Sequence, residues 1–202
     1  MPDLFSITDP VVCECKVKRS LFVAHLQPTI SLDEAKGFIR RINIDHKNAS
    51  HNCWAYIIGY TGDTFHFSDA GEPSGTAGKP IFNTLNKYRL TNITAVVTRY
   101  FGGIKLGVRG LITAYSNIVD MAVQQSSMIE IVRMQKIRIQ TDYDFIEKLQ
   151  YQLEKMGASL SDFIYSGMIS FLAVFPLEQG KIIMDYIDEL NKRNKLHYEI
   201  ES

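Results

Sequence analysis

The chain has 202 residues, of which 46% are hydrophobic and 22% charged, and its 22 basic residues equal its 22 acidic ones. This balance is typical of a globular protein whose core is large enough for stability, and the odd number of cysteines argues against a disulfide framework. No run approaches the roughly 18 apolar residues of a membrane span. Three cysteines without a secretory leader predict a cytoplasmic protein that makes no membrane contact.

Charge divides unevenly along the chain. Residues 1–128 carry 13 basic against 10 acidic side chains, whereas residues 129–202 carry 9 against 12. Because attraction to a phosphate backbone needs a basic surface, a nucleic-acid partner would prefer the first part of the chain.

The first part of the chain predicts strands mixed with helices. Ser31 and Glu34 form a capping-box pattern, whose side chains satisfy free amides of a first helical turn. Runs of β-branched and aromatic residues bounded by turn residues predict strands. The expected strands are 11–17, 21–26, 52–60, 64–68 and 93–100, and the expected helices are 31–45, 80–87 and 111–124.

The second part has a regular rhythm of its own. Alternating residues predict strands, and apolar residues at helical spacing predict helices between them. The expected order is a strand over 130–141, a helix over 142–156, a hairpin of 159–165 and 168–175, a helix over 177–191 and a strand over 195–201. This βαββαβ order predicts an independent ferredoxin-like domain that begins near residues 126–130.

Most of the glycines lie in two loops, 68–80 and 99–110, and each loop follows a predicted strand and precedes a predicted helix. Free amides at the two helix starts, beside basic side chains, would form an anion site. Alternatively, two tight loops simply need glycine to pack against each other. The residues that we expect to bind a ligand or anion are Asp69, Gly71, Glu72, Gly75, Thr76, Gly78, Lys79, Arg99, Gly102, Gly103, Lys105, Gly107 and Arg109.

Neither loop matches a known phosphate-binding motif. The P-loop requires a glycine five residues before its Gly-Lys pair, but Pro73 holds that place before Gly78-Lys79, and Pro80 follows where serine or threonine is needed. No Gly-x-Gly-x-x-Gly motif occurs either. The sequence therefore excludes a P-loop.

Catalytic interpretations rest on a few side chains. His51 and Cys53 lie two apart on a strand and could form a nucleophile pair, with His66 on the neighbouring strand, but packing is the expected role. Asp69 and Glu72 are a possible acid/base pair, although both residue types also suit turns. The cysteines and histidines lack the spacing of a zinc site, so we expect no metal and no cofactor.

Arg99 is a lone charge at the end of a predicted buried strand. It either pairs with Asp69 or Glu72 across the loops or faces an anion, and a structural ion pair is the expected outcome. Four aromatic residues of the second part could instead form a base-stacking platform for RNA. The acidic character of that part favours core packing for these residues, which are Phe163, Tyr165, Phe171 and Phe175.

The two loops together resemble the signature of the IMPACT family, whose bacterial members are called YigZ-type. The matching segments are 68–80 and 97–107. Further similar positions are Lys18-x-Ser20-x-Phe22, His51-x-Cys53 and Gly110-Leu111-x-x-Ala114-Tyr115, so that the likeness covers most of residues 18–120. Arg109 departs from the family pattern, in which this place is usually small, and adds a charge beside the loop.

The resemblance implies an α+β protein of two domains. Residues 1–128 would have the fold of the second domain of ribosomal protein S five, and residues 129–202 would form a ferredoxin-like domain similar to those of elongation factor G. Eukaryotic relatives carry an extra front domain and act as translational regulators that compete for the activator of an initiation-factor kinase. On this resemblance, we expect the chain to be of the bacterial type, without that front domain.

Two functions follow from the loops. The favoured hypothesis is a translation-associated regulatory protein that contacts RNA or a ribosome-associated protein through loops 68–80 and 99–110. The alternative is an enzyme that acts on a phosphorylated small molecule or nucleotide at the same loops, because the implied fold also hosts small-molecule kinases. A scaffold that binds another protein through the acidic second domain is a third possibility.

Overall fold

The computed structural model describes residues 4–201, and its contacts divide the chain into two units between Ile131 and Val132. The expected boundary lay three residues earlier, after residue 128. The difference arises because strand β7 (Met128–Glu130) pairs with strand β1 (Phe5–Ile7) and so belongs to the first unit. The expected single strand over 130–141 is therefore wrong: it is divided into β7 and β8 (Met134–Thr141).

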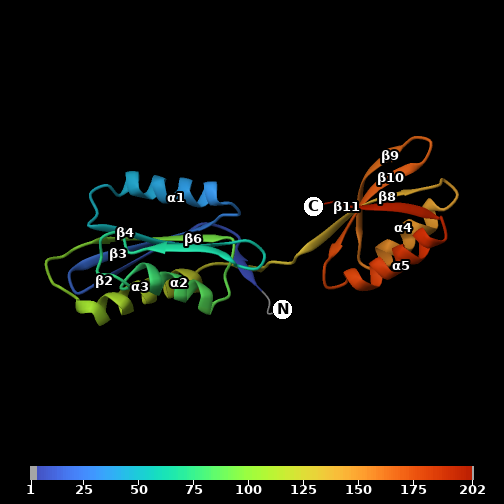
Figure 1. Cartoon of the computed structure of the whole chain (residues 1–202). Helices are drawn as coiled ribbons and strands as arrows, with labels where there is room; N and C mark the ends of the chain where they lie inside the picture. The colour runs from blue at the N-terminus through green and yellow to red at the C-terminus, as the bar shows by residue number, and fades with distance from the viewer. Residues whose placement is uncertain (1–3, 202) are drawn as a thin grey trace. The chain divides into compact units, whose positions relative to one another are not determined.

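The first unit is built on a five-stranded antiparallel sheet. In spatial order its strands are β2 (Val11–Val17), β3 (Ser20–Pro28), β6 (Ile93–Tyr100), β4 (His51–Ile58) and β5 (Thr64–Ser68). Helix α1 (Leu32–Asp45) covers one face, and helices α2 (Gly78–Lys87) and α3 (Gly107–Gln124) lie side by side on the other (Figure 1). The unit is thus a three-layer arrangement with one sheet in the middle.

Alternation along the strands supplies both faces of this sheet with apolar side chains. On β4, Cys53, Ala55 and Ile57 pack into the core under α2 and α3, whereas Tyr56 and Ile58 pack against α1. A strand buried on both faces gives a nearly continuous apolar run, which is the pattern that the sequence shows here.

Helix α1 begins as the capping box predicts. The Ser31 hydroxyl accepts a hydrogen bond from the Glu34 amide at 3.2 Å, and the Glu34 carboxylate accepts one from the Ile30 amide at 2.9 Å. Two acceptors thereby satisfy amides that no helical carbonyl can reach, which fixes the start of the helix.

Strand directions bring the two glycine-rich loops together. Strands β5 and β6 are each antiparallel to β4 and therefore run in the same direction, so both end at one edge of the sheet. Each is followed by its loop and then by α2 or α3. The turn between β2 and β3 lies at the same edge, because Leu21 at the start of β3 pairs with Tyr100 at the end of β6.

Helix α3 starts earlier than the sequence predicts. The expected start was residue 111, but the helix begins at Gly107, whose φ is +72°. Glycine adopts this left-handed conformation without a steric penalty, which lets the chain turn directly into the helix. Residues 107–110 are therefore the first helical turn rather than loop, and the connection after β6 is only residues 101–106.

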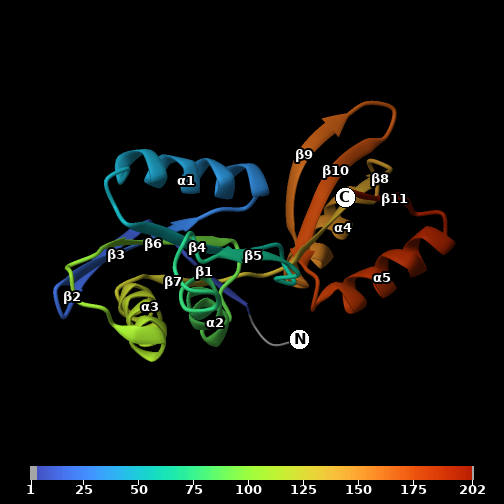
Figure 2. The same cartoon turned by 60° about the vertical axis from the view of Figure 1, so that its left-hand side comes forward.

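The second unit has the predicted βαββαβ order. Its sheet has the spatial order β11 (Leu196–Glu201), β8, β10 (Ile169–Pro176) and β9 (Ser159–Tyr165), with helices α4 (Ile146–Lys155) and α5 (Gly180–Lys192). Figure 2 shows the long β9–β10 hairpin at one edge of the sheet. Both helices start three or four residues later than expected, because turns precede them. The α+β organisation in two domains is confirmed.

The proposed aromatic platform of the second unit belongs largely to its core. Phe171 and Phe175 are fully buried against the helices, and Phe163 stacks on Phe171 with ring centroids 5.2 Å apart. Only Tyr165 at the hairpin tip is largely exposed. Core packing, the expected role, is thus what the structure shows for three of the four rings.

Candidate functional site

A buried ion pair joins the two glycine-rich loops. Arg99, at the end of β6, donates from Nη1 to Oε1 of Glu72 at 2.6 Å, and the two residues are only 5% and 8% exposed. Glu72, and not Asp69, is therefore the partner of Arg99. Because removing a charge from water is costly unless it is neutralised, each residue requires the other. Arg99 is consequently not available to bind an external anion.

Glu72 is also held by a residue in the middle of α3. The Tyr115 hydroxyl donates to the same Glu72 oxygen at 2.9 Å, and the Cys53 thiol lies 3.3 Å from that hydroxyl and 2.9 Å from the Asp69 carbonyl oxygen. Burial raises the pKa of Cys53 to about 12. The thiol is therefore protonated at neutral pH and cannot act as the nucleophile of a Cys–His pair.

The two histidines do not form a catalytic arrangement with Cys53. Nδ1 of His51 lies 3.0 Å from the Ala70 carbonyl oxygen, and its Nε2 lies 4.0 Å from Oε2 of Glu72. His66 pairs with Tyr56 across the strands and packs against Trp54, on the face that α1 covers. The possibility that His66 joins His51 and Cys53 is therefore wrong, because alternation places it on the opposite face.

The side chain of Asp69 lies at the start of α2. Its carboxylate accepts hydrogen bonds from the amides of Gly75 (2.8 Å), Ala77 (3.0 Å) and Gly78 (2.9 Å). Burial raises the pKa of Asp69, but these three bonds stabilise the carboxylate and bring the pKa below its ordinary value of 3.8. The expectation of free amides at this helix start is wrong, since an internal anion already fills the place.

Two glycines are required by close backbone packing. A Cβ on Gly78 would lie 2.6 Å from the Ser68 carbonyl carbon, and one on Gly102 would lie 1.8 Å from the Arg19 carbonyl oxygen. At Gly102, the Ser20 hydroxyl also accepts a hydrogen bond from the backbone amide and another from Arg99, each at 3.3 Å. These contacts fasten the β2–β3 turn to the second loop and support the packing interpretation of these two glycines.

The predicted ligand-binding residues therefore divide by burial. Glu72, Arg99 and Asp69 are engaged within the protein, as is Thr76, whose hydroxyl donates to the Pro73 carbonyl oxygen at 2.6 Å. Six of the predicted residues are exposed: Gly71, Lys79, Gly103, Lys105, Gly107 and Arg109. Three are half-buried, namely Asp69, Gly75 and Gly102, and four are buried, namely Glu72, Thr76, Gly78 and Arg99.

Two members of the buried cluster, Ser20 and Tyr115, were not among the predicted site residues. Both residues occur in the segments that resemble the IMPACT family, but no role was predicted for either side chain. A tyrosine in the middle of an apolar helix face carries a hydroxyl that needs a partner when buried, and this would have been the signal. The same reasoning applies to Ser20, which is fully buried at the start of β3.

Exposed cations gather at the edge of the sheet where the loops meet. We call Lys18, Arg19, Lys79, Lys105 and Arg109 the basic rim; all five are exposed, and they lie on the β2–β3 turn and on the two loop-to-helix segments. Segments 18–20, 68–80 and 99–110 together hold six basic residues against two acidic ones. Both acids, Asp69 and Glu72, are already engaged internally, so the rim is positively charged without compensation on these segments.

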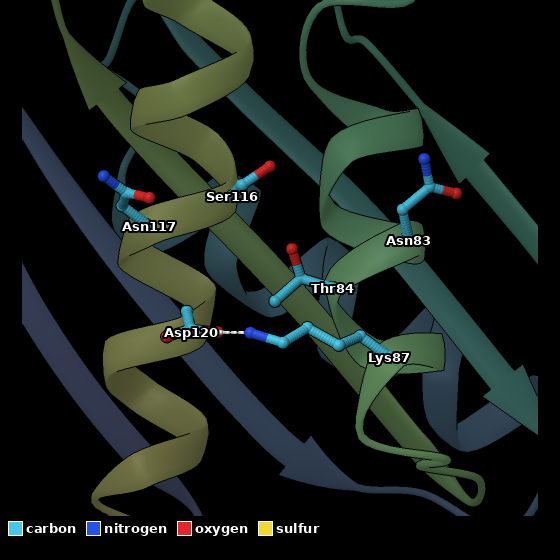
Figure 3. A pocket seen from close by; sticks show the side chains of 6 residues that line it. All are labelled: Asn83, Thr84, Lys87, Ser116, Asn117 and Asp120. Carbon is cyan, nitrogen blue, oxygen red and sulfur yellow. Dashed lines mark hydrogen bonds and ion pairs between the residues drawn. The ribbon is translucent and has the colours of Figure 1, made fainter.

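A second polar surface lies between α2 and α3 and was not predicted. It is a groove of about 350 Å³ lined by Asn83, Thr84, Lys87, Ser116, Asn117 and Asp120. Lys87 reaches across it and donates from Nζ to Oδ1 of Asp120 at 2.7 Å (Figure 3), and Tyr88 donates to the same oxygen at 2.9 Å. Its one cation and its one anion neutralise each other, so this groove has no net charge with which to select a ligand.

The described part of the chain holds neither a metal-ligand cluster nor a membrane-spanning helix. Within residues 4–201, no three His, Cys, Asp or Glu side chains come close enough to hold a metal ion. Over the same residues, no helix is both long enough and apolar enough to cross a membrane.

The whole chain resembles a solved structure. It superimposes with a TM-score of 0.69 on a protein described as "Crystal structure of an hypothetical protein", with 27% sequence identity over 100% of this chain and 98% of the other. The likeness extends over both units and supports the two-domain α+β organisation.

Sequence comparisons identify the family. The Impact N-terminal domain matches residues 18–123, which include both loops and the buried ion pair. The "IMPACT family member YvyE" of Bacillus subtilis is 36% identical over 92% of this chain and 86% of its own length. "Protein IMPACT" of Rattus norvegicus is 34% identical over 45% of this chain and 29% of its own length. The chain is a member of the IMPACT family.

Proposed function

We propose that the protein is a translation-associated regulatory protein that binds RNA through the basic rim. The observation that carries the proposal is the charge of the rim: five exposed cations surround loops whose two acids are both engaged internally. An uncompensated basic surface attracts a phosphate backbone whatever its sequence. Membership of the IMPACT family supports the link to translation, because the resemblance implies a translation-related role.

The internal contacts define which residues would touch RNA. Arg99 is held by Glu72 and Ser20, so it shapes the loops without reaching a ligand. Lys105 and Arg109, on the segment that follows β6, have exposed side chains. We therefore assign phosphate contacts to these two and to Lys79, with Lys18 and Arg19 of the neighbouring turn extending the same surface.

The geometry gives the enzyme alternative less support. The amides that would have held a phosphate at the start of α2 bind Asp69, and the Cys53 thiol is protonated. Glu72 is buried and accepts hydrogen bonds from Arg99 and from Tyr115, so its carboxylate is engaged within the protein and does not face a substrate.

The test is RNA binding as a function of salt. We expect a fluorescently labelled single-stranded RNA to bind the full chain at low salt, with affinity falling steeply as salt rises. Lys105→Ala/Arg109→Ala should weaken binding and reduce the slope of log K against log salt by about 0.7 for each phosphate that the variant no longer neutralises. The matched control is Lys155→Ala/Lys181→Ala, which removes two exposed cations from α4 and α5 of the second unit.

Co-sedimentation with ribosomes tests the link to translation separately. We expect the wild-type chain and the control variant to travel with ribosomal particles at low salt and the rim variant to be released. Absence of RNA binding at any salt, or equal weakening in the rim and control variants, would contradict the proposal.

A further inference from the structure

A cleft on the opposite face of the sheet from α2 and α3 has a different chemistry. It has a volume of about 370 Å³ and lies between α1 and strands β4 and β5. We call it the aromatic cleft; its lining residues are Lys36, Ile39, Arg40, Asn43, Trp54, Tyr56 and His66. None of these residues belongs to the basic rim or to the buried ion pair.

Helix α1 packs against β4 and β6, and β5 is the edge strand beside β4. The cleft therefore lies beside α1, over β4 and β5. The register sets Tyr56 opposite His66 and Trp54 opposite Ser68, so their side chains share the face that α1 partly covers. The side chain of His66 is exposed and that of Trp54 is half-buried. The edge of the sheet thus leaves aromatic side chains open to solvent beside the helix.

The aromatic side chains pack against one another, and Tyr56 is only 8% exposed. The rings of Trp54 and Tyr56 are nearly parallel, with an interplanar angle of 3° and centroids 5.8 Å apart, and His66 packs edge-on to Trp54 with centroids 5.6 Å apart. Trp54 and His66 form the accessible aromatic surface, where a planar ligand gains stacking energy on one ring and edge contact with the other. Stacking tolerates any base because every base has a π-face.

Two cations border this surface. Lys36 and Arg40 are exposed, lie one turn apart on α1, and take part in none of the ion pairs found among residues 4–201. No acidic residue lines the cleft. In the groove between α2 and α3, by contrast, Lys87 is neutralised by Asp120. The aromatic cleft therefore favours a ligand that is planar and negatively charged.

We propose that the aromatic cleft binds one unpaired nucleotide of a single-stranded RNA, with the base stacked on Trp54 and in edge contact with His66, and the phosphate paired with Lys36 and Arg40. The combination of aromatic stacking with flanking cations is the chemistry by which proteins hold single strands. The inference rests on the proposed RNA binding for the source of the nucleotide, and it adds a second contact on another face of the same unit. A duplex, whose bases are already stacked, does not fit this site.

Trp54 makes the proposal directly measurable, because it is the only tryptophan of the chain. We expect a short unlabelled single-stranded RNA to quench its fluorescence, and an RNA duplex of the same length to leave it unchanged. Lys36→Ala/Arg40→Ala and, separately, His66→Ala should each weaken the quenching titration by about tenfold. All three side chains are exposed, so circular dichroism should show folded variants. The control is again Lys155→Ala/Lys181→Ala, which should titrate like the wild type.

The outcomes separate this inference from the proposed function. If labelled RNA binds through the basic rim but tryptophan fluorescence does not change, the cleft proposal is wrong and the proposed function stands. If adenosine monophosphate quenches Trp54 and single-stranded RNA does not, the cleft takes a free nucleotide and the RNA occupant is wrong. If no RNA binds by either readout, both proposals fail.

Discussion

The first unit contains two neighbouring groups of charged residues, of which one is buried and the other is exposed. Glu72 and Arg99 are buried and neutralise each other, whereas Lys105 and Arg109 are exposed on the segment that follows Arg99 by only a few residues. A buried charge must be satisfied inside the protein, and this commits it to structure. An exposed cation that has no ion-pair partner in the protein can pair with an anionic ligand. Burial, and not position within a glycine-rich motif, therefore separates the two roles.

The largest expected effect is on the buried ion pair. Arg99→Met should lower the free energy of unfolding by about 3–5 kcal/mol, because it leaves the Glu72 carboxylate buried without its main partner. Urea denaturation followed by circular dichroism measures this change. Arg109→Met is the matched control on the exposed side and should stay within about 0.5 kcal/mol of wild type.

A second substitution tests whether the cost comes from the unpaired charge. Adding Glu72→Gln to Arg99→Met should recover part of the lost stability, since the remaining buried group is then neutral. Additive effects of the two single substitutions would mean that the pair is not coupled, and that burial does not commit these two residues to each other.

Asp69 should give the next largest effect. Asp69→Ala removes the acceptor of three amide hydrogen bonds at the start of α2 and should cost about 2 kcal/mol. Because the folded-state pKa lies below the ordinary 3.8, the carboxylate stabilises the folded state above that pH, and this contribution is lost as the pH falls through the lower folded-state value. Unfolding measured from about pH 6 down to about pH 2 should therefore show a weaker pH dependence in the variant.

Much of the fold could be predicted from the sequence, because local patterns decide it. The capping box at Ser31 and Glu34 predicted the start of α1, and alternation predicted the βαββαβ unit. The start of α3 was misplaced because Gly107 lies outside the apolar pattern and begins the helix through its left-handed conformation. Local pattern carries no signal for such a start.

The candidate site could be predicted only in part. The loops and their charged residues were found from glycine spacing, and the partner of Arg99 was narrowed to two acids. The choice between Asp69 and Glu72 depended on three-dimensional contacts. The Asp69 carboxylate accepts a hydrogen bond from an amide at the start of α2, whereas Glu72 points inward to Tyr115. The aromatic cleft was missed because it depends on how α1 packs on the face of the sheet that carries Trp54 and Tyr56, and local sequence patterns do not show this packing.

Tyr115→Phe should lower the stability less than Arg99→Met or Asp69→Ala. The substitution keeps the buried ring, which packs edge-on against Phe22 with centroids 5.3 Å apart, and removes only the hydroxyl that donates to Glu72. We expect a decrease of about 1 kcal/mol in the free energy of unfolding, because Glu72 keeps its bond to Arg99. A decrease as large as that of Arg99→Met would show that the hydroxyl, and not the ion pair, determines the stability of the cluster.

Arg109→Ser should have the smallest effect on the free energy of unfolding, but it should weaken RNA binding. The side chain of Arg109 is exposed in the first turn of α3, so the fold does not depend on it. We expect the unfolding free energy to stay within about 0.5 kcal/mol of wild type. RNA affinity at low salt should fall about threefold, and the salt slope should decrease by about 0.7, as expected when one phosphate is no longer neutralised. An unchanged slope would place Arg109 outside the RNA-binding surface and confine the basic rim to its other four cations, whereas a folding defect would mean that exposure does not separate binding residues from structural ones at this edge of the sheet.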